Sequence, residues 1–359
     1  MTSPLFRLML AFGCVALAVP ALATSATAPL VDHHLHIFSP ASSRVLKGIC
    51  AALGPGHCPD EVSKEPGTAK DVLQALDAAH IRQGVLLSGA YFFASPAAAA
   101  QKLDVPAETR AENTFIVDQA RLSCGRLMPF ISVSPLWDGA VAEIDYWGKH
   151  GGAVGVKLHL GNSGVDLSSR EQVRKLAAVF GAADRNHLAI VIHLQTQASS
   201  FGPKDVHIFL RDVAPAARHV PVQIAHAGSG GGLDKNILAG LQEFATEIRA
   251  RPKETRYLYF DLAMVPDLFS NTRKLSAPTG DTQALTRLMR QIGLKRFLPA
   301  SDYTLGLDLS AYYANQKLSL ALSEREWASF LKNKAPYVIT PTKARAHHPW
   351  LYPRPCAPT

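Results

Sequence analysis

The sequence predicts a single-domain (β/α)8 barrel, known as a TIM barrel, on three observations. Eight short apolar runs recur along the chain, their starts lie 25 to 53 residues apart, and amphipathic segments separate them. Strand–helix units of this length, eight in succession, are typical of a closed barrel of parallel strands. A doubly wound open sheet is the competing fold, but no glycine-rich phosphate loop follows the first run.

The eight predicted strands share one pattern. Each run is rich in β-branched or large apolar residues and ends at a polar or glycine-rich turn. The clearest helices between them show apolar residues at three- and four-residue spacing, at 69–80, 169–186 and 236–250. The runs themselves cover residues 30–38, 83–92, 127–136, 152–160, 188–196, 220–228, 256–264 and 295–303.

Residues 1–23 are typical of a secretory signal peptide. Arg7 precedes an apolar segment, and the small-x-small triplet Ala21-Leu22-Ala23 supplies a cleavage site. The apolar segment from Leu8 to Ala23 is 16 residues long and is interrupted by Pro20, so it is too short and too broken to span a membrane. We therefore expect a barrel domain at 24–359 that is exported, periplasmic or secreted, and has no stable membrane span.

Charge and composition limit the partners. The net charge is +8, but the basic residues are scattered, without a run of like charges or a patch of basic and aromatic residues. We therefore expect no nucleic-acid partner and predict a small-molecule substrate. A homo-oligomer stays open.

Four cysteines remain after removal of the signal peptide, at positions 50, 58, 124 and 356. An even number fits disulfide bonds in an oxidising compartment, and four unpaired thiols are the alternative. Cys50 and Cys58 flank a glycine- and proline-rich stretch, where a disulfide would close a small loop. We expect this loop as an insertion after the first strand.

Polar residues of metal-binding type lie where several predicted strands end. The carboxyl ends of the strands meet at one rim of a barrel, so these residues should converge there. Side chains two positions apart on a strand face the same side, so His34 and His36 face the centre, while His33 and Leu35 face the helices. The convergent residues are His34, His36, Lys157, His159, His193, His226 and Asp302.

Each of these residues alone has an ordinary explanation. A single histidine at a strand end is commonly structural, and Asp302 alone would fit a helix cap. The conjunction of ligand-type residues at several strand ends instead predicts a metal site. Imidazole and carboxylate ligands suit Zn²⁺ best, with iron, manganese or cobalt as other divalent choices.

These motifs resemble the amidohydrolase superfamily, in the branch called amidohydrolase family 2. The resemblance covers residues 30–338, and it implies that His34, His36 and His193 bind the metal while Asp302 completes the shell. His226 is implied to be either a ligand of a second metal or a catalytic acid/base and oxyanion stabiliser. The matching motifs, in family order, are VDHHLHIF, GVKLH, VIHLQT, IAHAGSGGG, PASDYTLG and FLKNKAPYV.

Lys157 leaves the number of metals open. In some relatives a lysine on this strand is carboxylated and bridges two metals, and His193 and His226 would then bind the second one. Many members of the branch have a lysine here and hold one metal, so Lys157 would instead have a structural role or bind a substrate carboxylate. One metal is the leading interpretation.

The resemblance implies a hydrolase first, in which metal-activated water attacks an amide, ester or lactone of a small substrate. Asp302 would accept the proton of that water, and His226 would stabilise the negative charge on the substrate. The alternative is a metal-dependent, non-oxidative decarboxylase or hydratase of a small aromatic or unsaturated acid, and a binding protein without turnover is third. The residues expected to bind the substrate are Lys157, His159, Trp137, Asn162 and Gln195.

Overall fold

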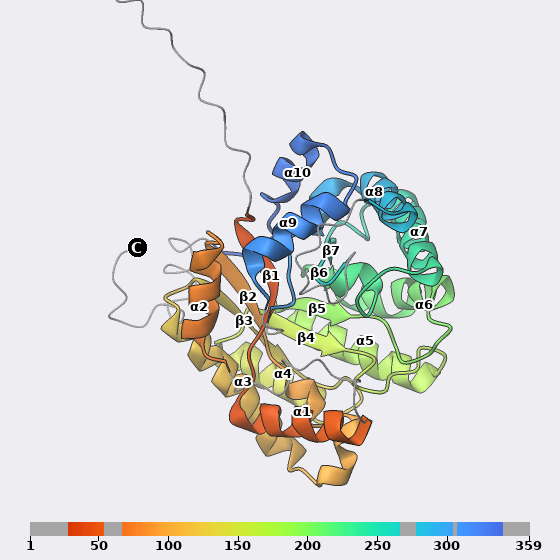
Figure 1. Ribbon diagram of the computed structural model, residues 1–359. Helices are drawn as coiled ribbons and strands as arrows, with labels where there is room; N and C mark the ends of the chain where they lie inside the picture. Colours follow the sequence, from red (N-terminus) through yellow and green to blue (C-terminus); the bar gives the residue numbers. More distant parts are fainter. Residues whose placement is uncertain (1–27, 54–66, 266–277, 304–306, 340–359) are drawn as a thin grey trace, which may run out of the picture.

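The computed structural model describes residues 28–53, 67–265, 278–303 and 307–339. Eight parallel strands form one sheet in sequence order, and helices surround it (Figure 1). This confirms the predicted (β/α)8 barrel. The strands are β1 (Val31–His36), β2 (Gln83–Leu87), β3 (Leu127–Ser132), β4 (Gly155–His159), β5 (Ala189–His193), β6 (Val222–Ile224), β7 (Leu258–Asp261) and β8 (Phe297–Leu298).

Most α-helices begin at a capping residue. Thr68 and Asp71 form a capping box, and Ser169 and Asp234 each accept a hydrogen bond from a backbone N–H of the first turn. The three predicted helices therefore begin within one residue of their expected positions. The α-helices are α1 (Pro40–Leu53), α2 (Ala69–Ala78), α3 (Val105–Leu122), α4 (Ala140–His150), α5 (Arg170–Arg185), α6 (Pro203–Ile208), α7 (Lys235–Ala250), α8 (Gly280–Ile292), α9 (Leu309–Ser319) and α10 (Glu324–Phe330).

The strands are buried on both faces, which explains why they appear as apolar runs in the sequence. On β5, Ile190 and Ile192 pack in the large cluster beneath the helices, whereas Val191 belongs to the cluster inside the barrel. Tyr337, from the chain after α10, also packs in this inner cluster, with its ring centroid 5.0 Å from that of Phe130. The inside of the barrel is therefore filled by side chains.

The barrel closes through the chain that follows β8, because β8 itself has only two residues. The backbone N–H of Asp302 donates to the carbonyl of His34 at 2.9 Å, and a parallel bridge joins Leu35 to Tyr303. The last segment of the barrel is thereby held against the first strand. This closure places Asp302 beside the two predicted histidine ligands of β1.

The insertion expected after the first strand is only partly covered by the structure. Cys50 lies on α1 rather than in a loop, and residues 54–66, including Cys58, lie outside the described residues. The inserted loop therefore stays a prediction. Cys50 and Cys124 are each disulfide-bonded, so the alternative of four unpaired thiols is wrong.

The structure does not test the predicted signal peptide or the predicted export. The signal peptide at 1–23 lies outside the described residues, and export therefore stays a prediction. Within the described part of the chain, no helix has the length and apolar composition needed to cross a membrane.

Gly155, the first residue of β4, has no room for a side chain. A Cβ there would lie 2.1 Å from Cε1 of Phe130 and 2.5 Å from the backbone oxygen of Ala189. Because this oxygen belongs to the neighbouring strand and cannot yield easily, Gly155→Ala should lower the free energy of unfolding by roughly 1–3 kcal/mol. Gly280→Ala is the control, since nothing lies within 4 Å of its Cβ position. Denaturant titrations that give both variants equal stability would contradict this packing argument.

Candidate metal centre

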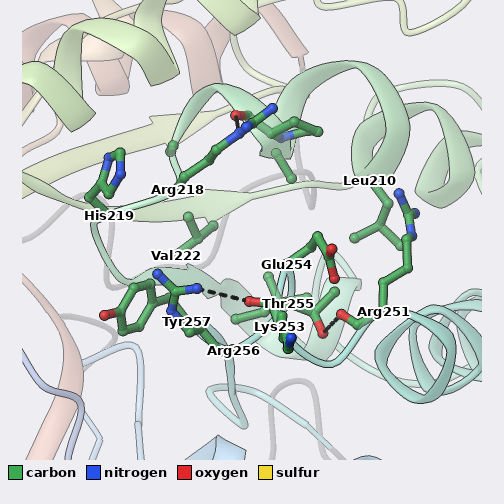
Figure 2. A pocket seen from close by; sticks show the side chains of 14 residues that line it. Leu210, Arg218, His219, Val222, Arg251, Lys253, Glu254, Thr255, Arg256 and Tyr257 are labelled. Atoms are coloured by element: carbon green, nitrogen blue, oxygen red, sulfur yellow. Dashed lines mark hydrogen bonds between the residues drawn. The ribbon is translucent and has the colours of Figure 1, made fainter.

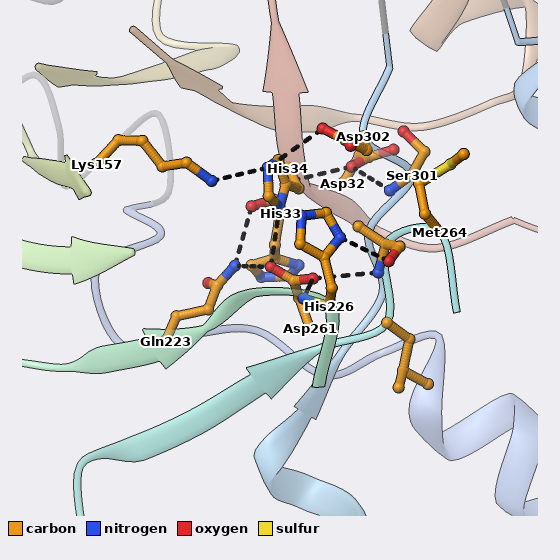
Figure 3. A network of polar contacts seen from close by, with 12 residues as sticks. Asp32, His33, His34, Lys157, Gln223, His226, Asp261, Met264, Ser301 and Asp302 are labelled. Atoms are coloured by element: carbon orange, nitrogen blue, oxygen red, sulfur yellow. Dashed lines mark hydrogen bonds and ion pairs between the residues drawn. The ribbon is translucent and has the colours of Figure 1, made fainter. Parts of the chain in front are cut away.

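Three predicted ligands meet at the carboxyl ends of β1 and β8. Nε2 of His34 lies 3.2 Å from Nε2 of His36 and 3.3 Å from Oδ1 of Asp302. The same Asp302 oxygen lies 3.4 Å from Nε2 of His36. These three groups are close enough to one another to hold a metal ion, and Figure 3 shows His34 and Asp302 at this centre.

Hydrogen bonds on the outer ring nitrogens orient the imidazoles. Nδ1 of His36 lies 3.0 Å from the carbonyl oxygen of Leu87, and Nδ1 of His226 lies 2.8 Å from that of Ala263. A carbonyl oxygen only accepts, so Nδ1 must donate in both rings and Nε2 keeps its lone pair. Two such imidazoles and a carboxylate form a donor set that fits a divalent metal ion.

Burial keeps the imidazoles of His34, His36 and His193 neutral, the form that binds a metal. Loss of solvent lowers the pKa of His36 to about 4, although the nearby Asp302 carboxylate raises it. Burial, and then the positive charge of Lys157, lower the pKa of His34 well below its usual value. Burial does the same to His193. A bound metal would therefore not have to displace a proton from these rings at neutral pH.

Lys157 lies next to the ligand cluster. Its Nζ donates to Nε2 of His34 at 3.1 Å, and its side chain is fully buried. Burial lowers the pKa of Lys157 to about 8, while the negative charges of Asp302 and Asp261 raise it. The lysine therefore remains mostly protonated at pH 7, as a cation beside the predicted metal site.

Asp302 is the accessible carboxylate of the centre. Burial raises its pKa, but electrostatic interactions with His34, His226, His36 and the Lys157 ammonium lower the pKa below its usual value, so the group is ionised. Its side chain is 23% exposed, whereas that of Asp261 is fully buried. Among these carboxylates, Asp302 is the one that can exchange a proton with a bound molecule or with water.

The backbone is strained at the same strand ends. His226, Ala227, Met264 and Asp302 all have φ between +52° and +61°, the left-handed region that residues other than glycine rarely adopt. Such residues persist where the surrounding structure over-determines them, and they cluster at functional sites. Here the hydrogen bond from Asp302 N to the carbonyl of His34 holds one of these turns in place.

His193 lies beside the cluster instead of inside it. Its ring centroid is 5.0 Å from that of His226 and 3.8 Å from that of His159, on which it stacks. Among the described residues, the groups whose ligand atoms lie within 4.8 Å of one another do not include His193. Its role as a ligand stays a prediction.

Some of the predicted substrate-binding residues lie at the rim of the barrel, and Trp137 lies among the helices. Nδ1 of His159 accepts a hydrogen bond from the backbone N–H of Asn162 at 3.1 Å. A Cβ on Gly230 would lie 2.3 Å from Oε1 of Gln195 and 3.7 Å from Nε2 of His193, so Gln195 also borders the rim. Trp137 instead packs over Gly139 and against the helix-side core cluster, so a substrate role for it has no support.

Asp261 is a site residue that the motifs did not reveal. It ends β7, and its Oδ2 lies 3.1 Å from Nδ1 of His34 (Figure 3). The seventh apolar run contains FDLAM, so a carboxylate at a strand end was present in the sequence. The role of Asp261 depends on its contact with His34, and the pattern of strands in the sequence does not predict that contact.

A separate cavity lies at the other end of the barrel (Figure 2). It has a volume of about 560 Å³ and is bordered by Val222 and Leu258, the first residues of β6 and β7. Its basic residues Arg218, Lys253 and Arg256 are exposed. It lies at the amino ends of the strands and is therefore not part of the metal centre.

Comparison with known proteins identifies related sequences and folds. A family model described as amidohydrolase matches residues 31–332. No curated protein matches the chain. The solved 5-carboxyvanillate decarboxylase from Sphingomonas paucimobilis is 12% identical, with a TM-score of 0.54 over 88% of this chain and 98% of that one.

Two further solved structures show the same fold. A dihydroxybenzoic acid decarboxylase from Polaromonas, with bound manganese and the inhibitor 2-nitroresorcinol, is 13% identical with a TM-score of 0.53, covering 87% of this chain and 96% of that one. A structure described as amidohydrolase II is 17% identical with a TM-score of 0.53, covering 86% of this chain and 98% of that one.

These comparisons correct the expected reaction. Most of the similar structures are decarboxylases, so the leading expectation of an amide, ester or lactone hydrolase is wrong, and the alternative is favoured. A metal cofactor is supported, but zinc is not, because the ion in three of the similar structures is manganese.

Asp32→Asn should remove part of the pH dependence of stability. Burial raises the pKa of Asp32 to about 7, against hydrogen bonds from Ser301, His34 and Tyr313 that lower it. A carboxyl whose pKa is raised on folding contributes stability that is complete below its unfolded pKa, near 4, and is lost as the pH rises to 7. The free energy of unfolding of the metal-free wild type, relative to Asp32→Asn, should fall by roughly 2–4 kcal/mol over this range. Urea titrations at several pH values measure the difference, and a constant value would contradict the assignment.

Proposed function

Since the chain belongs to the amidohydrolase family, we propose that it is a metal-dependent lyase that decarboxylates a small aromatic acid without oxidation. The observation that carries the proposal is the cluster of His34, His36 and Asp302 with the Lys157 ammonium beside it. Such a site has ligands for a divalent ion and a cation for an acid substrate. The likeness in fold to decarboxylases of hydroxybenzoic acids supports this choice of reaction.

One divalent ion fits among Nε2 of His34, Nε2 of His36 and Oδ1 of Asp302, with His193 and His226 beside them. We propose manganese first, because three of the similar decarboxylase structures contain it, and zinc as the other candidate for these ligands. When bound, the ion would supply Lewis-acid stabilisation of negative charge on the substrate oxygens.

Lys157 binds the acid group of the substrate in this proposal. The single lone pair on Nε2 of His34 cannot serve both a metal ion and the Lys157 ammonium, so the lysine must leave it when the metal binds. With a pKa of about 8, Lys157 is then a buried cation available for an anionic oxygen. Pairing with a substrate anion compensates its burial.

Asp302 is the proton carrier. Decarboxylation breaks the bond between a ring carbon and the carboxyl carbon, releases carbon dioxide, and places a proton on that ring carbon. Asp302 is ionised in the free enzyme and its side chain is partly exposed, so it can take up a proton from solvent and pass it to this ring carbon, whereas Asp261 is fully buried. Nε2 of His226 faces the same centre and can hydrogen bond a substrate oxygen.

Stacked rings beside the centre favour a flat substrate. The rings of His159 and His193 stack with an interplanar angle of 11°, and the buried Tyr91 lies 5.1 Å from His159. On the other side, Phe38 stacks on His36 at 5.7 Å. Aromatic surfaces of this kind gain most from contact with another planar ring.

Decarboxylation can be tested directly with the manganese-loaded enzyme and a panel of hydroxylated and methoxylated benzoic acids. We expect release of carbon dioxide and incorporation of one solvent deuterium at the vacated ring position. Asp302→Asn, which cannot carry the proton, should lower kcat by roughly 100-fold or more. Hydrolysis of ester or lactone substrates, without carbon dioxide release from any acid, would refute the proposal.

Metal removal gives a second test. Dialysis against a chelator should abolish decarboxylation, and Mn²⁺ should restore it, because the ion would supply the charge stabilisation. Metal analysis should find one ion per chain in the wild type and substantially less in His36→Gln. Full activity of a verified metal-free enzyme would contradict a metal-dependent reaction.

A further inference from the structure

Asp261 ends β7 as a fully buried carboxylate whose acceptor positions are all used. Oδ1 accepts the backbone N–H of His226 at 2.8 Å and that of Ala263 at 3.1 Å. Oδ2 accepts from Nε2 of Gln223 at 2.7 Å and lies 3.1 Å from Nδ1 of His34 (Figure 3). A carboxylate has about four such positions, so none remains for another partner.

This saturation separates Asp261 from the metal ligands. By distance alone, His34, His226 and Asp261 could also hold an ion. However, the four contacts of Asp261 occupy both of its oxygens. Asp261 therefore supports the centre from behind His34.

The contact with Asp261 fixes the tautomer of His34. Backbone and amide N–H groups fill the other three positions on the carboxylate, so the oxygens accept and Nδ1 of His34 must donate. Nε2 then keeps its lone pair and faces Nε2 of His36 and Oδ1 of Asp302. The opposite tautomer would also place an N–H against the Lys157 ammonium, which donates to the same atom.

Gln223 holds Asp261 in place from inside the barrel. Its Nε2 also donates to the carbonyl of His33 at 3.2 Å, and its Oε1 accepts from the hydroxyl of Tyr337. These two contacts fix the orientation of the amide, because a flipped amide would place its oxygen against the carbonyl of His33. The support of the centre thus extends from β7 through β6 to the chain after α10.

We propose that Asp261 is the positioning residue of the metal centre, which holds His34 in the tautomer and ring orientation that bind the ion. Through the backbone N–H of His226 it also fixes the left-handed turn that directs His226 to the centre. The assignment rests on the proposed function for its metal, but the His34 tautomer exists without one. Carboxylates that orient a ligand histidine typically change metal affinity by about 10- to 100-fold when they are removed.

The tautomer can be measured first in metal-free wild-type protein. Imidazole 15N shifts of histidine-labelled protein distinguish protonated Nδ1 from protonated Nε2, and His34→Gln identifies the His34 signals. We expect hydrogen on Nδ1. Hydrogen on Nε2 would overturn the proposal, whether or not the protein binds a metal.

Asp261→Asn is the second measurement. The asparagine must turn its NH2 group toward two of the four donors, and when it faces Gln223 and His34, His34 can adapt by moving its hydrogen to Nε2 so that Nδ1 accepts. This blocks the metal-binding lone pair, as the same kind of substitution does in a catalytic triad that depends on a histidine tautomer. We expect the reversed tautomer and a Mn²⁺ affinity roughly 10- to 100-fold weaker, measured by chelator competition.

Asp32→Asn is the matched control. Asp32 is equally buried and accepts the backbone N–H groups of His34 and Ser301, but it does not touch the imidazole. Its third partner is the Tyr313 hydroxyl, which can donate or accept, so an asparagine fits there. We expect this variant to keep hydrogen on Nδ1 of His34 and nearly wild-type Mn²⁺ affinity.

The outcomes are distinguishable. Wild-type affinity in Asp261→Asn, or an equal loss of affinity in both variants, would overturn the positioning role. If Asp261→Asn does not fold, the tautomer in the wild type decides the proposal by itself. A wild type with hydrogen on Nδ1 but no metal affinity would refute the proposed metal-dependent reaction while supporting the effect of Asp261 on His34.

Discussion

The closure of the barrel between β1 and the chain after β8 is the constraint on which the centre depends. β8 contributes only two residues, so the hydrogen bond from Asp302 N to the His34 carbonyl and the Leu35–Tyr303 bridge complete the ring of strands. The same backbone contacts that close the barrel bring the accessible carboxylate to the histidines of β1.

The inner core then sets the electrostatics of the centre. Apolar side chains fill the barrel below the rim, and the resulting burial lowers the pKa of His34 and His36 so that both stay neutral. Buried polar groups are costly unless their hydrogen bonds are satisfied. Asp261 and Gln223 meet this condition through contacts with β1, with β6 and with the chain after α10, which makes the polar end of the barrel rigid.

The ligand cluster alone does not decide the reaction. The same histidines and carboxylate can activate water or stabilise a decarboxylating acid, which explains why the motif pattern favoured hydrolysis and the comparisons did not. The residues around the ligand cluster favour one kind of substrate over the other. A buried cation at Lys157 and a stack of rings at His159 and His193 suit a planar acid.

The sequence by itself determined the barrel and the convergence of its polar residues, because strand spacing, apolar runs and the alternation of side chains are local properties. The expectation that His33 faces the helices is wrong: its ring bonds to Pro299 and Ala335 and lies 6.4 Å from that of Tyr337 in the inner cluster, because the register of β1 shifts between Asp32 and Leu35. Only the tertiary structure decided which ring nitrogens face the centre, the support by Asp261, and the place of His193 beside the cluster. The reason is physical: the orientation of an imidazole depends on its hydrogen-bond partner, and for His34 that partner lies 227 residues away in the chain.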